Sequence, residues 1–251
     1  MKKFLALVMA VLMTVAAFAG CGAKKGNTIV DGKLTMGTNA TFPPYEFTDD
    51  SGKIVGIDAE IAAAVAEKLD LELVIKDMEF DSLLTAVQGN SIDIVFAGLT
   101  VTDERKEAVD FSMTYAQGVQ VVIVPEDSKI KDIDGLKKAK IGVQAGTTGD
   151  IYCTDEYGQE NRKQIQNGAL AVAALANKQI DCVVIDNEPA KAFVAANKGL
   201  KILETEYAVE DYAAAISKSN PELKEAVNKA MQELKDDGTI DKIIGKYIKA
   251  E

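Results

Sequence analysis

The chain alternates short apolar runs with stretches in which apolar residues recur every three or four positions. The short runs are rich in β-branched residues and predict strands, and the recurring pattern predicts helices. Strands are expected at 33–37, 71–75, 92–96, 119–124, 140–143, 181–185 and 200–203. Because strands alternate with helices, the pattern indicates an α/β fold with mainly parallel sheets.

Helices are clearest after Asp58, from Leu83 to Val87, and in the last thirty residues. Asn220 and Pro221 are typical of a helix cap and first turn. Two other stretches, 115–124 and 210–215, are extended without a helical period. Periodicity leaves open whether these two are edge strands or crossings between two lobes.

The first twenty residues have the pattern of a secretory signal peptide. Lys2 and Lys3 precede an apolar run, residues 4–18, that is broken only by Thr14. This run is shorter than the roughly 20 residues that span a bilayer, although a short membrane anchor is the alternative. The following Phe18-Ala19-Gly20-Cys21 resembles the bacterial lipobox, with Phe18 in place of the usual Leu. The resemblance implies that Cys21 is lipidated and that residues 21–28 form a tether. The protein is then expected to be extracytoplasmic, anchored by its lipid at the outer face of the bacterial cytoplasmic membrane or in the periplasm.

Composition excludes several classes of function. The chain has 251 residues and a formal net charge of −11, which becomes −13 when Lys2 and Lys3 are removed with residues 1–20. Such acidity argues against a nucleic-acid partner. The absence of histidine excludes Ser-His-Asp and Cys-His catalysis and the usual zinc sites. No catalytic residue, metal or cofactor is expected.

Two cysteines, Cys153 and Cys182, follow the signal region. An oxidising compartment permits a disulfide between them. Two buried thiols are an equally good interpretation, because spacing alone does not fix the geometry.

Several segments, in this order along the chain, are similar to the polar amino-acid-binding proteins of ABC importers (solute-binding protein family 3). They are GTNATFPPYEF at 37–47, VGID at 55–58, FDSLL at 80–84, AGLTVTDER at 97–105, AVDFS at 108–112, IGVQAGTTG at 141–149 and VID at 184–186. The resemblance covers nearly all of the chain after the signal region.

This resemblance implies a two-lobe fold of the periplasmic-binding-protein type II, in which two hinge crossings join α/β lobes around the ligand. Lobe 1 is then 29–117 with 214–251, and lobe 2 is 118–213. The two extended stretches become the hinge. The implied partners are a free L-amino acid and an ABC transporter membrane permease, and the protein is expected to be a monomer.

A free amino acid needs an anion site and a cation site close together. Arg105 suits the α-carboxylate, since a guanidinium binds it with two hydrogen bonds; Thr100, Thr147 and Thr148 are expected beside it. The resemblance assigns the α-ammonium to Asp186 and to the carbonyl of Ala97 or Gly98. The alternatives are a surface ion pair of Arg105 with Asp103 or Glu104, and a helix cap by Asp186.

The resemblance places Phe42 and Phe80 on either side of the ligand side chain, although a place in the core is the alternative for both. Asn39 and Gln144 would select that side chain. Two neutral amides favour a glutamine-like ligand, and the nearby Glu46 could serve a basic one.

Two further functions remain open. The first is a periplasmic dehydratase of the cyclohexadienyl or arogenate type on the same fold, with Glu46 as its general acid. The second is a sensor domain, which the single lipid anchor argues against.

Overall fold

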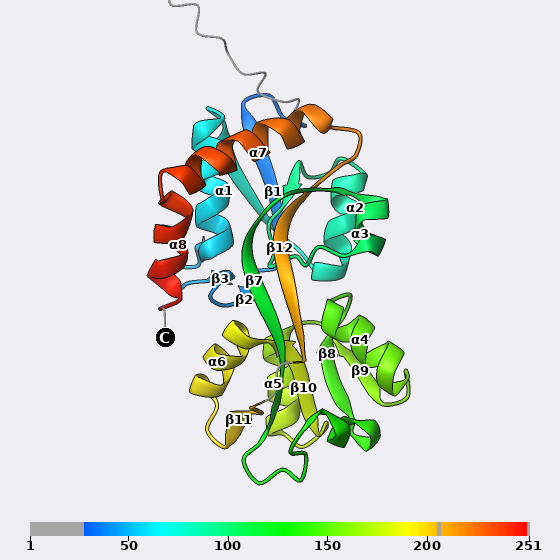
Figure 1. Ribbon diagram of the computed structural model, residues 1–251. Helices are drawn as coiled ribbons and strands as arrows, with labels where there is room; N and C mark the ends of the chain where they lie inside the picture. The colour runs from blue at the N-terminus through cyan, green and yellow to red at the C-terminus, as the bar shows by residue number, and fades with distance from the viewer. Residues whose placement is uncertain (1–27, 205–206, 250–251) are drawn as a thin grey trace, which may run out of the picture.

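The computed structural model describes residues 28–204 and 207–249. The predicted signal peptide and Cys21 lie outside these residues. Two α/β lobes stand end to end and are connected by two long strands that run side by side through a waist (Figure 1). This is the predicted two-lobe, type II architecture. None of the described helices is long and apolar enough to cross a membrane.

The first lobe contains residues from both ends of the described chain. Its strands are β1 (Lys33–Thr38), β2 (Thr41–Phe42), β3 (Glu46–Thr48), β4 (Ile54–Val55), β5 (Glu72–Asp77) and β6 (Ile94–Val95). Its helices are α1 (Ile57–Lys68), the 3₁₀ turn η1 (Phe80–Ser82), α2 (Leu83–Gln88), α3 (Asp103–Ala108), α7 (Pro221–Asp236) and α8 (Thr239–Tyr247).

The second lobe is built from the middle of the chain. Its strands are β8 (Ile141–Gln144), β9 (Arg162–Ile165), β10 (Cys182–Asp186) and β11 (Leu200–Ile202), and its helices are η2 (Ile133–Lys138), α4 (Thr148–Tyr157), α5 (Gly168–Ala176) and α6 (Asn187–Ala196). The connecting strands are β7 (Asp110–Pro125) and β12 (Ala208–Ile216).

A single mixed sheet runs through both lobes in the order β5-β1-β6-β12-β7-β10-β8-β9, with β11 also paired to β7. Strands are parallel within the lobes, for β1 with β5 and β6, and for β8 with β9 and β10. The prediction of mainly parallel pairing is wrong at the centre, where β7 is antiparallel to both β12 and β10. One crossing strand leaves the first lobe and the other returns to it, so the two run in opposite directions. The lobe boundaries predicted at 117/118 and 213/214 fall within β7 and β12 and stay a prediction.

Two small features were not predicted. Strand β9 is a partly exposed edge strand with polar residues, and β2, β3 and β4 form a separate sheet of strands only two or three residues long. Neither has enough apolar alternation to mark a strand in the sequence.

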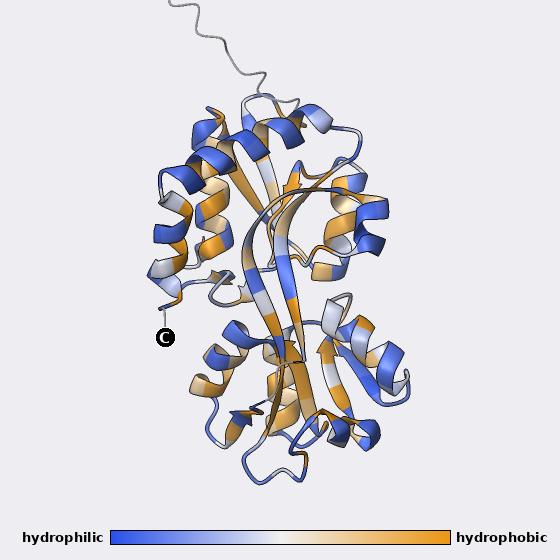
Figure 2. Ribbon diagram, viewed as in Figure 1, coloured by the Kyte–Doolittle hydropathy of each residue, from blue (hydrophilic) through white to orange (hydrophobic). Residues whose placement is uncertain are grey.

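Hydrophobic residues concentrate on the strands, whereas the helices carry both hydrophobic and hydrophilic residues (Figure 2). The helix predicted after Asn220 is confirmed as α7: the Asn220 side chain accepts a hydrogen bond from Leu223 N at 3.2 Å. Its apolar stripe is fully buried, namely Leu223, Val227, Met231 and Leu234. In the second lobe Cys153 and Cys182 are buried free thiols in one apolar cluster.

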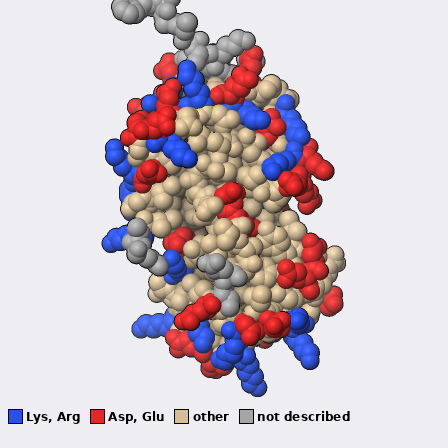
Figure 3. Space-filling model, in the orientation of Figure 1, with Lys and Arg blue, Asp and Glu red and all other residues tan. Residues whose placement is uncertain are grey.

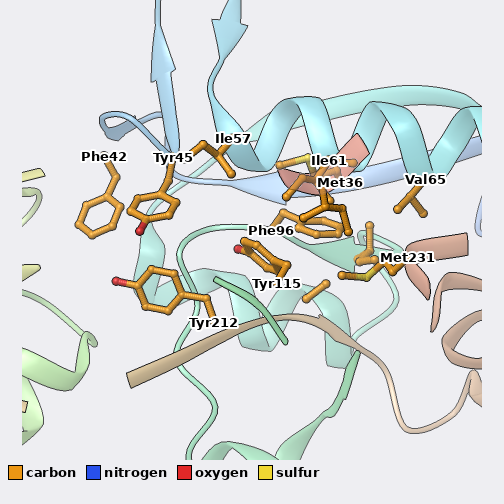
Figure 4. Packing of buried hydrophobic residues seen from close by; sticks show 14 of the residues in the cluster. Met36, Phe42, Tyr45, Ile57, Ile61, Val65, Phe96, Tyr115, Tyr212 and Met231 are labelled. Carbon is orange, nitrogen blue, oxygen red and sulfur yellow. The ribbon is translucent and has the colours of Figure 1, made fainter. Parts of the chain in front are cut away.

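At the waist, the backbone of one connecting strand lies very close to a side chain of the other. Gly118 on β7 faces the Tyr212 phenol on β12, and a Cβ at Gly118 would overlap that hydroxyl and lie 2.5 Å from Asp186 Oδ1. The Tyr212 ring in turn packs edge-on against Tyr45, with ring centroids 5.2 Å apart (Figure 4). A side chain larger than that of glycine therefore fits at position 118 only if Tyr212 and Asp186 move.

We expect Gly118→Ala to lower the free energy of unfolding by about 1–3 kcal/mol, because Tyr212 and Asp186 must move to make room. The melting temperature should fall by several degrees. The control is Gly245→Ala in α8, where an added methyl group meets no atom within 4 Å. Equal melting temperatures for Gly118→Ala and the wild type would contradict the packing described.

Candidate ligand-binding site

A pocket lies at the waist, between the lobes. Its lining consists of Asn39, Phe42, Glu46, Phe80, Ala97, Gly98, Thr100, Arg105, Gln144, Thr147, Thr148 and Asp186. The structure thus brings together all of the predicted contact residues, with Glu46 in addition. Their roles in binding stay predictions.

Arg105 is held by the start of α3. Thr102 caps this helix by accepting from Arg105 N at 3.1 Å, which directs the side chain inward. The buried guanidinium donates to the carbonyls of Thr100 (2.8 Å) and Gly146 (3.0 Å). Its centre lies 5.7 Å from the Phe80 ring centroid.

Arg105 therefore has no carboxylate partner among the described residues. The alternative of a surface ion pair is wrong, because Asp103 pairs with Lys106 instead, and Arg105 is only 6% exposed. Burial lowers the pKa of Arg105, as expected for a cation removed from water without a counter-ion.

The N-terminus of α4 faces the same pocket. Thr147 caps this helix: its hydroxyl accepts from Asp150 N (3.3 Å) and donates to the carbonyl of Gln144 (2.8 Å). The N–H groups of Thr148 and Gly149 have no acceptor among residues 28–204 and 207–249. Together with Arg105 they make a site for an anion.

Asp186 lies at the C-terminal end of β10. Its Oδ2 accepts from Gln120 Nε2 at 2.8 Å, and its Oδ1 accepts from the Tyr212 hydroxyl. Although Asp186 precedes α6, its side chain makes no capping hydrogen bond, so the alternative of a helix cap is wrong. Burial, and then the charge of Glu210, raise the pKa of Asp186 to about 7.

A turn from the first lobe brings backbone carbonyls to the pocket. Gly98 has a positive φ of 51°, and its N–H donates to Asp58 Oδ2 at 2.7 Å. The carbonyls of Ala97 and Gly98 accept no hydrogen bond within the described part of the chain. They are acceptors available to a ligand.

Glu46 and Asp58 form a buried carboxyl pair. Burial raises the pKa of Glu46 well above its usual range, and the charge of Asp58 adds to this. Burial raises the pKa of Asp58 only to about 6, since Gly98 and Tyr115 donate to it. Glu46 is therefore the member of the pair that holds a proton more readily.

Two polar residues behind the pocket were missed in the sequence. Gln120 on β7 donates through Nε2 to both Asp186 and Glu210, and Glu210 on β12 also accepts from Thr100 Oγ1 at 3.0 Å. Gln120 interrupts an otherwise apolar run, Val119–Val124, and this was the available signal.

The two amides expected to select the side chain bind each other. Gln144 Nε2 donates to Asn39 Oδ1 at 2.9 Å, and Asn39 Oδ1 also accepts from Thr41. Asn39 Nδ2 donates to the Met78 carbonyl. Gln144 Oε1 has no donor among the described residues, and each of the two amide nitrogens uses only one of its two hydrogens, so this end of the pocket can both accept and donate hydrogen bonds.

Comparisons with known proteins agree on one family. A model of the bacterial extracellular solute-binding proteins, family 3, matches residues 34–250. The chain is 32% identical to the arginine-binding extracellular protein ArtP of Bacillus subtilis (strain 168), over 100% of both chains. An ancestral arginine-binding protein bound to glutamine is 41% identical, with a TM-score of 0.83 over 88% of this chain and 100% of that chain. An ancestral arginine-binding protein bound to arginine is also 41% identical, with a TM-score of 0.82 over 86% of this chain and 98% of that one.

The unliganded protein should lose stability as pH rises from about 4 to about 7, because folding raises the pKa of Asp186 from 3.8 to about 7. Below this window the carboxyl is protonated in both states, and above it folding buries a charge. Folding also raises the pKa of Asp58 and of Glu46, so these two carboxyls likewise lower the stability as pH rises. Asp186→Asn should remove its part of the slope, on the order of a few kcal/mol, in urea unfolding at pH 4.5 and 8. Asp103→Asn, which changes an exposed carboxylate, is the control; an unchanged slope for Asp186→Asn would refute the assignment.

Proposed function

The chain belongs to the bacterial extracellular solute-binding proteins of family 3, and on this premise we propose that it captures a free L-amino acid and delivers it to the membrane permease of an ABC importer. The observation that carries the proposal is the opposite polarity of the two sides of one buried pocket. One side has a cation and free N–H groups, and the other has a carboxylate and free carbonyls.

The α-carboxylate of the ligand would lie between Arg105 and the N-terminus of α4. Arg105 comes from the first lobe and α4 from the second, so one carboxylate would bind both lobes at once (Figure 1). The α-ammonium would lie against Asp186, with the Ala97 and Gly98 carbonyls and the Thr100 hydroxyl nearby. Each contact offsets the cost of a charge that is already buried without a counter-ion.

The side chain of the ligand would extend past Phe42 and Phe80 toward Asn39 and Gln144. The free acceptor there suits both an amide and a guanidinium, and the similar ancestral proteins bind glutamine in one structure and arginine in another. Around the pocket the carboxylates of Asp58, Asp186 and Glu210 outnumber the single guanidinium of Arg105. Acidic side chains also gather at the waist on the face shown in Figure 3. This excess favours a basic amino acid over a glutamine-like one.

Closure of the lobes on the ligand would signal occupancy to the permease. A ligand held by groups of both lobes stabilises the closed state by the difference between its affinities for the closed and open states. We propose that the protein acts as a monomer outside the cell membrane, attached through a lipid on Cys21, which lies outside the described residues. The permease partner and this anchor are parts of the proposal.

Binding without chemistry is favoured over the dehydratase alternative. A dehydratase needs a general acid that faces its substrate. Glu46 lines the pocket, but burial and the charge of Asp58 raise its pKa well above the usual range, so it would release a proton to a substrate only reluctantly. Turnover of arogenate or prephenate by the purified protein would support the alternative instead.

A thermal-shift screen of the twenty amino acids tests the proposed function directly. At a ligand concentration about 100-fold above Kd, stability should increase by about 2.7 kcal/mol by mass action. Basic amino acids should give the largest shift and L-glutamine a smaller one. A flat response to all twenty would exclude the proposed function.

Arg105→Ala should weaken binding of L-arginine by about 2–5 kcal/mol, because the α-carboxylate would be buried without its partner. Lys106→Ala on the same helix is the matched control, since Lys106 is exposed and forms an ion pair with the exposed Asp103. Calorimetry that finds equal affinity for Arg105→Ala and the wild type would show that the carboxylate binds elsewhere.

A further inference from the structure

Glu210 lies directly behind the pocket without lining it. It is 4% exposed, and its Oε2 accepts from Thr100 Oγ1 at 3.0 Å and from Gln120 Nε2 at 3.1 Å. The same Gln120 nitrogen donates to Asp186 Oδ2 at 2.8 Å. One carboxylate is thereby connected to the first lobe through Thr100 and to the second lobe through Gln120 and Asp186.

In this arrangement two buried carboxylates, those of Asp186 and Glu210, accept hydrogen bonds from the same amide nitrogen of Gln120. Like charges so close raise each other's free energy, and burial increases the cost. Arg105 lines the pocket but makes no ion pair with Asp186 or Glu210 within the described residues. Its guanidinium donates to two backbone carbonyls instead. A positive group beside Asp186 would relieve this repulsion, and the ammonium of an amino acid would enter there.

We propose that Glu210 is a positioning residue that makes the site selective for ligands with an α-ammonium group, acting on Asp186 through Gln120. The inference rests on the proposed function and extends it to a residue that the ligand does not touch. Glu210 adds negative potential at the ammonium position, and through Gln120 it fixes the orientation of the Asp186 carboxylate. Glu210 also accepts a hydrogen bond from the Thr100 hydroxyl, and the backbone carbonyl of Thr100 accepts one from the Arg105 guanidinium. Thr100 thereby connects Glu210 with Arg105.

The test is Glu210→Gln, which keeps the shape of the side chain and an oxygen for Thr100 but removes the charge. The probes are L-arginine and 5-guanidinopentanoate, which has the same side chain and carboxylate but no α-ammonium. In calorimetry the affinity for L-arginine should fall on the order of tenfold, while that for 5-guanidinopentanoate should change less than about twofold. If the wild type prefers glutamine, L-glutamine and 4-carbamoylbutanoate replace this pair.

Equal losses for both probes, or no loss for either, would overturn the role of Glu210. A wild type that binds no amino acid would overturn the proposed function as well, and the two failures are thereby distinguished. Glu79→Gln is the matched control, because Glu79 also accepts a hydrogen bond from the other lobe, from Gln166 Nε2 at 2.6 Å, but is exposed. The ratio of the two affinities should be unchanged in this variant.

Gln120→Met keeps the test valid if Glu210→Gln folds poorly, because it separates Glu210 from Asp186 at similar volume. It should reduce the preference for the α-ammonium in the same direction. In an Asp186→Asn background, Glu210→Gln should have a smaller effect on L-arginine than in the wild type, because only its direct contribution to the potential remains. Additive losses in this double-mutant cycle would contradict the proposal.

Discussion

The antiparallel pairing of β7 with β12 connects the lobes and also forms the back of the pocket. Its ladder extends from Asp110 paired with Ile216 to Gln120 paired with Ala208. On the way it brings Gly118 against Tyr212 and Gln120 against Glu210. Any motion of one lobe relative to the other must bend or twist these two strands. The same motion therefore acts on the hydrogen bonds that hold Asp186, so movement of the lobes and the proposed ammonium site depend on the same residues.

Buried charges without ion-pair partners explain why such a pocket costs stability. Within residues 28–204 and 207–249, Arg105 donates only to backbone carbonyls, and Asp186 accepts from neutral donors only. Neutral hydrogen bonds reduce the cost of desolvating a charge, but they do not remove it. A zwitterion would supply both missing counter-charges in one molecule, one for a group of each lobe. Local rules of stable folding are broken most often where a protein binds, which supports the proposed place of the ligand in this pocket.

Local patterns in the sequence were enough for most of the helices and strands, whereas the lining of the pocket was predicted mainly from the resemblance to a known family. The capping of α7 by Asn220 and the position of Asp186 at the end of a buried strand both follow from neighbouring residues. The network behind the pocket does not, because Gln120 and Glu210 are 90 residues apart and Thr100 and Glu210 are 110 apart. The mixed pairing of the sheet was mispredicted for the same reason. Periodicity reports which face of an element is buried, and it is silent on which distant element covers it.

The contact between Asn39 and Gln144 changes how selectivity has to be argued. In the sequence they are two independent amides, each able to donate and accept, and the natural inference is a neutral amide ligand. In the structure they belong to different lobes and bind each other, and Asn39 Oδ1 already receives two donors. One hydrogen bond of the pair therefore connects the lobes, and the other bonds of Asn39 stay within the first lobe. What remains for the ligand is the acceptor on Gln144 and one hydrogen on each amide nitrogen, in a region with excess negative charge. Electrostatics, and not amide pairing, then decides between glutamine and a basic amino acid.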